Sequence, residues 1–173
     1  KNNMSVIASL LSLQSDTVQD DAAKTALQEA RNRVQSMSVL YDRLYRSDGA
    51  NEMPLDEYLS PLIDKLVAMF PIDPYINVEK HLEPIVLNAR ILFSLGIIVN
   101  ELLTNAFKYA FKRGERGTVR IIAESEGPRI TVKVIDSGGR YQEPVNEGAQ
   151  TGFGLQVVQL MARQIGASFA IQR

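Results

Sequence analysis

The residues best suited to chemistry share one polar stripe of a long, otherwise apolar helical pattern. At about 100° per residue, Glu101, Asn105 and Lys108 fall on one helix face with Tyr109 at its border, whereas Asn100 points elsewhere. A carboxylate four residues before a carboxamide supplies hard oxygen ligands that suit a hydrated Mg²⁺ ion. The lysine would add a point charge for a phosphate, and the tyrosine a flat surface for a base. The alternative interpretation is a solvated stripe on a core helix.

Two glycine-bearing segments further along the chain add a second signal. Asp136 ends a β-rich run and precedes Gly138, so its carboxylate is expected at a strand end, beside backbone that a ligand can approach closely. Such a carboxylate can accept a hydrogen bond from an exocyclic amine, although an aspartate before glycine also simply initiates turns. Gly152 and Gly154 open a final helix, where free backbone N–H groups and the helix dipole favour phosphate.

Composition excludes several other chemistries. The 173 residues include no Cys and one His, which rules out Cys-based zinc sites, thiol nucleophiles, iron–sulfur clusters and His-rich metal sites. The 19 basic and 20 acidic residues form no like-charge block, so a nucleic-acid partner is not expected. The longest apolar stretch, residues 91–99, is much shorter than the roughly 18 residues of a membrane span, so we expect no membrane segment here.

Two kinds of element must position these groups. Residues 2–46 show helical apolar spacing interrupted by a short polar turn, which predicts an antiparallel helical hairpin. Its apolar stripe needs a partner, either the rest of the chain or a second copy forming a four-helix bundle. Turn residues at 47–51 predict a boundary, so we expect two domains, residues 1–50 and 51–173.

The second domain alternates helical and extended patterns. Its expected elements, in order, are a helix with Pro54 in its first turn that ends before Pro71, short extended segments at 76–78 and 85–87, a helix over 90–111, a β-hairpin of 119–123 and 130–135, a long loop to Thr151, a helix from Gly152, and a strand from Ser168.

This ordered set of motifs resembles a known enzyme family. Residues 100–111 look like the N-box, Asp136-Ser137-Gly138 the first glycine box and Gly152-Phe153-Gly154-Leu155 the second, of the histidine kinase branch of the gyrase, chaperone and mismatch-repair ATPase superfamily. Residues 1–11 and 44–47 resemble the phosphoacceptor region of HWE-related histidine kinases. The resemblance implies an α+β fold, in which the helical hairpin serves dimerisation and phosphotransfer. An α/β sandwich would follow and bind ATP and Mg²⁺ between its helical layer and a mobile lid.

The resemblance also implies a role for each matching residue. Asn105 would ligate Mg²⁺, Lys108 would contact phosphate, and Tyr109 would line the nucleotide site. Asp136 would read the adenine amino group.

The remaining implied roles concern a base and three glycines. Glu101 matches the general base of the hydrolysing relatives, and in a kinase it would help deprotonate the acceptor imidazole. Gly138, Gly152 and Gly154 would let the backbone approach the nucleotide and let the lid close.

The sequence departs from the family pattern at two places. The family's phosphorylated histidine lies three residues before the lysine that matches Lys1, and His81 lies in a charged connection rather than on the hairpin. In the first glycine box, Arg140 stands where the family usually has its last glycine.

The expected function is the ATP-dependent protein-histidine kinase core of a two-component sensor. It would phosphorylate a histidine just upstream of Lys1 and pass the phosphoryl group to an aspartate of a response regulator receiver domain. A non-catalytic phosphotransfer or scaffold protein with a degenerate nucleotide site is the alternative, and a serine-kinase anti-sigma factor is a third hypothesis. The hairpin predicts a homodimer, with a monomer left open. We expect a cytoplasmic location, with membrane attachment through upstream segments left open.

Overall fold

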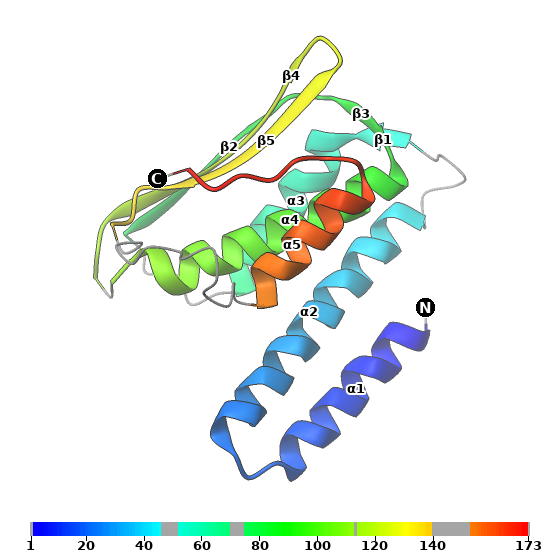
Figure 1. The fold of residues 1–173 in the computed structure, drawn as a ribbon, viewed down its shortest axis with the longest axis vertical. Helices are drawn as coiled ribbons and strands as arrows, with labels where there is room; N and C mark the ends of the chain where they lie inside the picture. Colours follow the sequence, from blue (N-terminus) through cyan, green and yellow to red (C-terminus); the bar gives the residue numbers. More distant parts are fainter. Residues whose placement is uncertain (1, 46–51, 70–74, 113, 140–152, 173) are drawn as a thin grey trace. The chain divides into compact units, whose positions relative to one another are not determined.

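A computed structural model describes residues 2–45, 52–69, 75–112, 114–139 and 153–172 of the chain (Figure 1). By internal contacts the chain divides into two compact units, Lys1–Ala50 and Asn51–Arg173. Each unit is described by itself below.

The first unit is the predicted helical hairpin, which is confirmed. Helices α1 (Asn2–Thr17) and α2 (Asp21–Tyr45) pack against each other. Asp20 begins α2 because its carboxylate accepts the backbone N–H of Ala23 at 3.0 Å, a helix N-cap. The apolar stripe of α1 stays between 47% and 64% exposed, at Val6, Ile7, Leu10 and Leu13.

The second unit contains two sheets. A two-stranded antiparallel sheet joins β1 (Glu52–Pro54) to β3 (Val86–Asn88). A three-stranded sheet has the order β2 (Ile76–Leu82), β4 (Gly117–Glu126) and β5 (Arg129–Asp136). Strand β2 is parallel to β4, and β4 is antiparallel to β5. The predicted extended segments and hairpin are confirmed; β2, β4 and β5 are longer than predicted, and β3 is shifted by one residue from the predicted 85–87.

Two predicted elements need correction. Pro54 ends β1 instead of opening a helix, which begins at Leu55; an edge strand tolerates proline because the missing N–H faces no partner. The strand expected from Ser168 is absent from the described residues 167–172. That segment begins with a Schellman helix end, in which Gly166 has a φ of +69° and the Ala167 N–H bonds the Ala162 carbonyl at 2.9 Å.

The helices of the second unit cover one face of the three-stranded sheet (Figure 1). They are α3 (Leu55–Met69), α4 (Ala89–Asn105), the π-helix η1 (Ala106–Ala110) and α5 (Phe153–Gln164). The core lies between the layers. Strand β4 alternates as a half-buried strand should, with Val119, Ile121 and Ala123 buried and the intervening Arg120 exposed.

The central helix has an unusually apolar sequence. The stretch Ala89–Ala110 is long and apolar enough to cross a membrane by composition alone. In this fold, 56% of the apolar part of this stretch is buried within the unit, as in the core helix of a globular domain.

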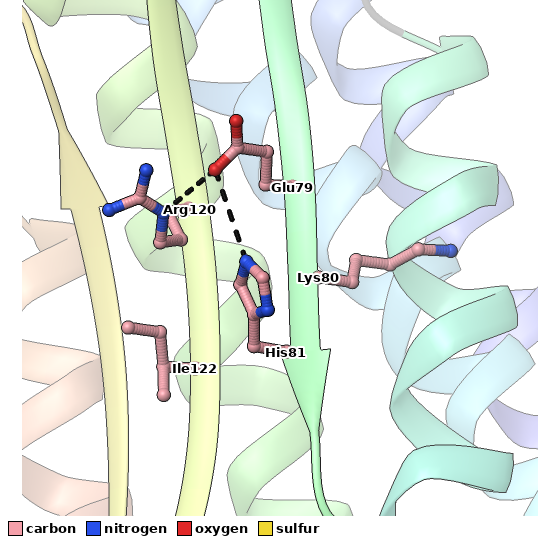
Figure 2. A pocket seen from close by; sticks show the side chains of 5 residues that line it. All are labelled: Glu79, Lys80, His81, Arg120 and Ile122. Carbon is pink, nitrogen blue, oxygen red and sulfur yellow. Dashed lines mark hydrogen bonds and ion pairs between the residues drawn. The ribbon is translucent and has the colours of Figure 1, made fainter.

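The sheet face turned away from the helices carries a hollow lined by charged side chains (Figure 2). Arg120 Nε donates to Glu79 Oε2 at 2.7 Å, and His81 Nε2 lies 4.0 Å from the same oxygen. Lys80 points the other way, toward α3, where its Nζ bonds Asp64 Oδ1 at 2.6 Å. The hydrogen bond from Arg120 lowers the pKa of Glu79.

This pairing predicts a local titration effect. In Arg120→Gln, the pKa of Glu79 should rise toward its ordinary value, because the main favourable partner of the carboxylate is lost. The sign follows from linkage. The pKa of Glu79 is lower in the folded state than in the unfolded state, so the pair stabilises the fold at pH values above the unfolded-state pKa. This stabilisation is lost as the pH falls through the folded-state pKa. Carboxyl-detected NMR titration measures the change. The pKa of Glu83, lowered by hydrogen bonds from Ser125, serves as control and should not move. An unmoved Glu79 would contradict the assignment.

Candidate functional site

The polar stripe of the central helix begins with a buried pair. Glu101 is 1% exposed and its neighbour Asn100 is 6% exposed. Asn100 does not point away from the stripe as the helical arithmetic predicts: its Nδ2 donates to Glu101 Oε1 at 3.4 Å. A buried pair bonded to each other is not a solvated face, so that alternative does not describe these two residues.

Beyond the buried pair the helix changes type. Asn105 is the partly buried last residue of α4, and the Ala106 N–H contacts both the Leu102 and Leu103 carbonyls. Residues 106–110 then form η1, whose i→i+5 hydrogen bonds make a wider turn than an α-helix. The arithmetic of 100° per residue therefore fails after Asn105, and it misplaces Lys108 and Tyr109 around the axis. A π-turn inside an apolar helix leaves no recognised sequence signal.

Both η1 side chains of interest reach the surface. Lys108 is exposed, and Tyr109 is 53% exposed. Solvent therefore reaches Lys108 and Tyr109, whereas Glu101, about two turns earlier on the helix, is enclosed.

Asp136 lies at the end of β5 on the sheet face that the helices cover. It stands opposite Val119, which is fully buried, and directly opposed residues share a face of the sheet. Its Oδ1 accepts the Gly138 N–H at 3.1 Å, so the aspartate does initiate a turn. A carboxylate has about four acceptor positions, so this bond leaves capacity for an amine.

Gly138 joins this strand end to η1. A Cβ built on Gly138 would lie 2.1 Å from the Ala110 carbonyl oxygen, so any side chain would force the two segments apart. The structure therefore brings the Asp136 turn to the end of η1, the π-helix that carries Lys108 and follows Asn105. Sequence reasoning assigned this glycine to a nucleotide, but it did not find the contact with Ala110.

Two further contacts fix the same corner. The Phe111 ring lies so close to Gly117, at the start of β4, that a Cβ there would be 2.1 Å from the ring. Ser137 exchanges two hydrogen bonds with Thr118: its Oγ accepts the Thr118 N–H at 2.9 Å, and its N–H bonds the Thr118 carbonyl at 3.0 Å. The strand ends and the helix end form one packed junction.

The second glycine box is only partly described. Gly154 is buried in the first turn of α5 and begins a stripe with Val158 and Ala162, each four residues apart, on a helix that packs against α4. Its small size therefore serves helix packing whether or not it also contacts a ligand. Gly152 and Arg140 lie outside the described residues.

The oxygen ligands at the junction suit a magnesium ion that is bound mainly through nucleotide phosphates better than one bound mainly by protein side chains. Within the described ranges, no group of three or more His, Cys, Asp or Glu residues is placed to hold a metal. Magnesium normally takes one or two protein ligands and completes its shell with water and substrate phosphate. The amide oxygen of Asn105, partly buried at the end of α4, suits that arrangement. The hollow of Figure 2 involves other residues, on the opposite face of the sheet.

Family comparisons agree with these motifs. Residues 1–70 match the family described as histidine kinase, and residues 77–169 match the family described as histidine kinase-like ATPase domain. The sensor histidine kinase PdtaS of Mycolicibacterium smegmatis is 30% identical over 166 residues, which cover 95% of this chain and 32% of that protein. The blue-light-activated histidine kinase 2 of Erythrobacter litoralis is 24% identical, over 100% of this chain and 51% of that protein.

A solved structure shares the fold. The histidine kinase domain of the Erythrobacter litoralis blue-light-activated kinase EL346 superposes with a TM-score of 0.73 at 20% identity, covering 98% of this chain and 89% of that one. The present chain spans about a third of the length of its PdtaS relatives.

The junction predicts different outcomes for two adjacent glycines. Gly138→Ala should weaken binding of ADP with Mg²⁺ at least tenfold and destabilise the fold by roughly 1–3 kcal/mol, the usual cost of overpacking, because its Cβ meets the Ala110 carbonyl. Gly139→Ala is the matched control, since a Cβ there meets nothing within 4 Å, and should change affinity less than twofold. Titration calorimetry and thermal denaturation measure both effects. Equal behaviour of the two variants would show that the contact does not hold the site.

Proposed function

The chain belongs to the histidine kinase family, and we propose that it is the kinase core of a two-component sensor that uses ATP and Mg²⁺ to phosphorylate a histidine upstream of Lys1. The observation that carries the proposal is the junction of Gly138 with Ala110. It brings the turn that follows Asp136 against the end of η1, the π-helix that directly follows Asn105. One acceptor for an adenine amine and one magnesium ligand thus come from two elements held together by backbone contact.

Each residue of the junction has a defined task in this proposal. Asp136 accepts a hydrogen bond from the adenine amino group, and Tyr109 lines the base. Asn105 ligates Mg²⁺, and Lys108 neutralises phosphate charge from its exposed position on η1. Bound ATP with Mg²⁺ supplies the phosphoryl group and most of the charge neutralisation, so positioning is the main contribution of the chain.

The proton of the transfer step goes to Glu101. The P–O bond to ADP breaks as a P–N bond to the acceptor imidazole forms, and the Glu101 carboxylate takes the imidazole N–H proton.

The partners follow from the same proposal. The phosphoryl group passes from the histidine to an aspartate of a response regulator receiver domain. Residues 1–50 act as the dimerisation and phosphotransfer hairpin, and residues 51–173 as the ATP-binding domain, in the cytoplasm. The half-exposed stripe of α1 supports a homodimer, in which a second hairpin would cover it.

The competing function is a phosphotransfer scaffold whose nucleotide site has degenerated, and Arg140 in the first glycine box is its support. Calorimetric titration with ADP and a non-hydrolysable ATP analogue, with and without Mg²⁺, separates the two. We expect micromolar, Mg²⁺-sensitive binding, weakened at least tenfold in Asp136→Asn because a charged acceptor is lost. Asn105→Ala should remove the Mg²⁺ sensitivity. Arg120→Gln, in the hollow, is the control and should bind normally. Absence of binding to the unaltered chain would favour the scaffold.

The chemistry of the product tests the reaction itself. A chain extended upstream to include the acceptor histidine should take label from γ-labelled ATP into an acid-labile, base-stable phosphoramidate, and a receiver domain should then remove it. Circular dichroism and nucleotide binding check that each preparation is folded. Acid-stable label would instead identify a serine kinase and overturn the proposal.

A further inference from the structure

A buried amide adjoins the proposed base and has no assigned role. Asn100 is 6% exposed, on a helix whose residues 94–101 are all buried. Most of its buried neighbours on α4 are apolar, including Ile97, Val99 and Leu103. A carboxamide enclosed among such residues is costly unless hydrogen-bonded, at roughly 1–3 kcal/mol by mutational measures. Packing alone would favour a leucine at this position.

We propose that Asn100 is a positioning residue for phosphoryl transfer, whose side-chain amide holds the carboxylate of Glu101 in its working orientation. The juxtaposition that carries this is the 3.4 Å contact from Asn100 Nδ2 to Glu101 Oε1 between two enclosed side chains. The inference rests on the proposed function, since it concerns the base of that reaction.

The geometry of the contact separates it from ordinary helix spacing. Residues three or four apart share a helix face, whereas consecutive residues diverge by about 100°. For Asn100 to meet Glu101, the two side chains must turn toward each other across that angle. At 3.4 Å the contact is long for a hydrogen bond, and it holds both side chains to the rotamers that allow it.

When its rotamers are restricted in this way, the Glu101 carboxylate is more often in the geometry that lets it accept the imidazole proton. General-base catalysis requires the acceptor oxygen within hydrogen-bonding distance of the proton. Partners that orient metal-ligating side chains change activity about 10- to 100-fold, and we expect a similar effect for a base held in the same way. Nucleotide binding, by contrast, depends on Asn105, Lys108 and Asp136 in our proposal. Loss of the Asn100 amide should therefore lower kcat and leave the KM for ATP nearly unchanged.

The test is a double-mutant cycle on the kinase extended upstream to include its acceptor histidine. The single variants are Asn100→Leu, which keeps the side-chain volume, Asn100→Ala and Glu101→Gln. The double variants combine each Asn100 change with Glu101→Gln. Ser94→Ala is the matched control, because Ser94 is a 1%-exposed polar residue of the same helix whose hydroxyl donates to the Arg90 carbonyl oxygen at 3.2 Å. Single-turnover phosphorylation, ADP affinity with Mg²⁺ and thermal stability are measured for each.

The proposal expects a roughly tenfold or larger fall in the single-turnover rate for both Asn100 variants, with ADP affinity within twofold of the unaltered chain. In the Glu101→Gln background the same changes should cost less than twofold, because their effect acts through the carboxylate. Equal losses in both backgrounds, or an equal loss in Ser94→Ala, would overturn the positioning role. Full activity of Glu101→Gln would show that Glu101 is not the general base. Absence of ADP binding to the unaltered chain would contradict the proposed function, so the two failures can be told apart.

Discussion

The candidate site depends on one close contact, the backbone of Gly138 against the carbonyl of Ala110. Interiors are packed so densely that a single methyl group at this point would separate a strand end from a helix end. The strand end carries Asp136, and the helix end is that of η1, which directly follows Asn105, so the contact ties these two segments together. The Phe111 ring against Gly117 and the paired bonds of Ser137 hold the same junction from the sheet side. The residues of the proposed nucleotide site on these separate elements are thereby held together by the fold itself.

The central helix combines two requirements that usually conflict. More than half of its apolar stretch is buried in the core, and it also carries Glu101 and Asn105. The fold reconciles these by enclosing Glu101 with a bonded amide and by changing to a π-turn after Asn105, where the side chains reach the surface. Single π-turns within helices occur frequently at functional sites. The same helix therefore provides stability at its centre and the proposed ligand contacts at its end.

Much of this fold is predictable from sequence, because strong periodicity dictates burial. The hairpin, the burial of Leu55 and Leu59 and the β4–β5 pair all follow from apolar spacing. The features that sequence does not predict are local. Strand β1 is only three residues long and ends in a proline. The π-turn and the contact of Asn100 with Glu101 depend on packing that no periodicity encodes. Each site motif can be recognised in the sequence, but the contact of Gly138 with Ala110 arises from tertiary packing and cannot be read from any one motif. Gly152 and Arg140 lie outside the described residues, so their roles stay predictions.

The most direct measurement of the central claim is an NMR titration of the isotope-labelled chain with ADP and Mg²⁺. The account predicts that the largest amide shifts fall at residues 105–110 and 136–139, on both sides of the junction, while signals of Glu79 and Ile122 in the hollow stay in place. Shifts confined to the hollow, or to only one side of the junction, would contradict a nucleotide site built by the contact of Gly138 with Ala110.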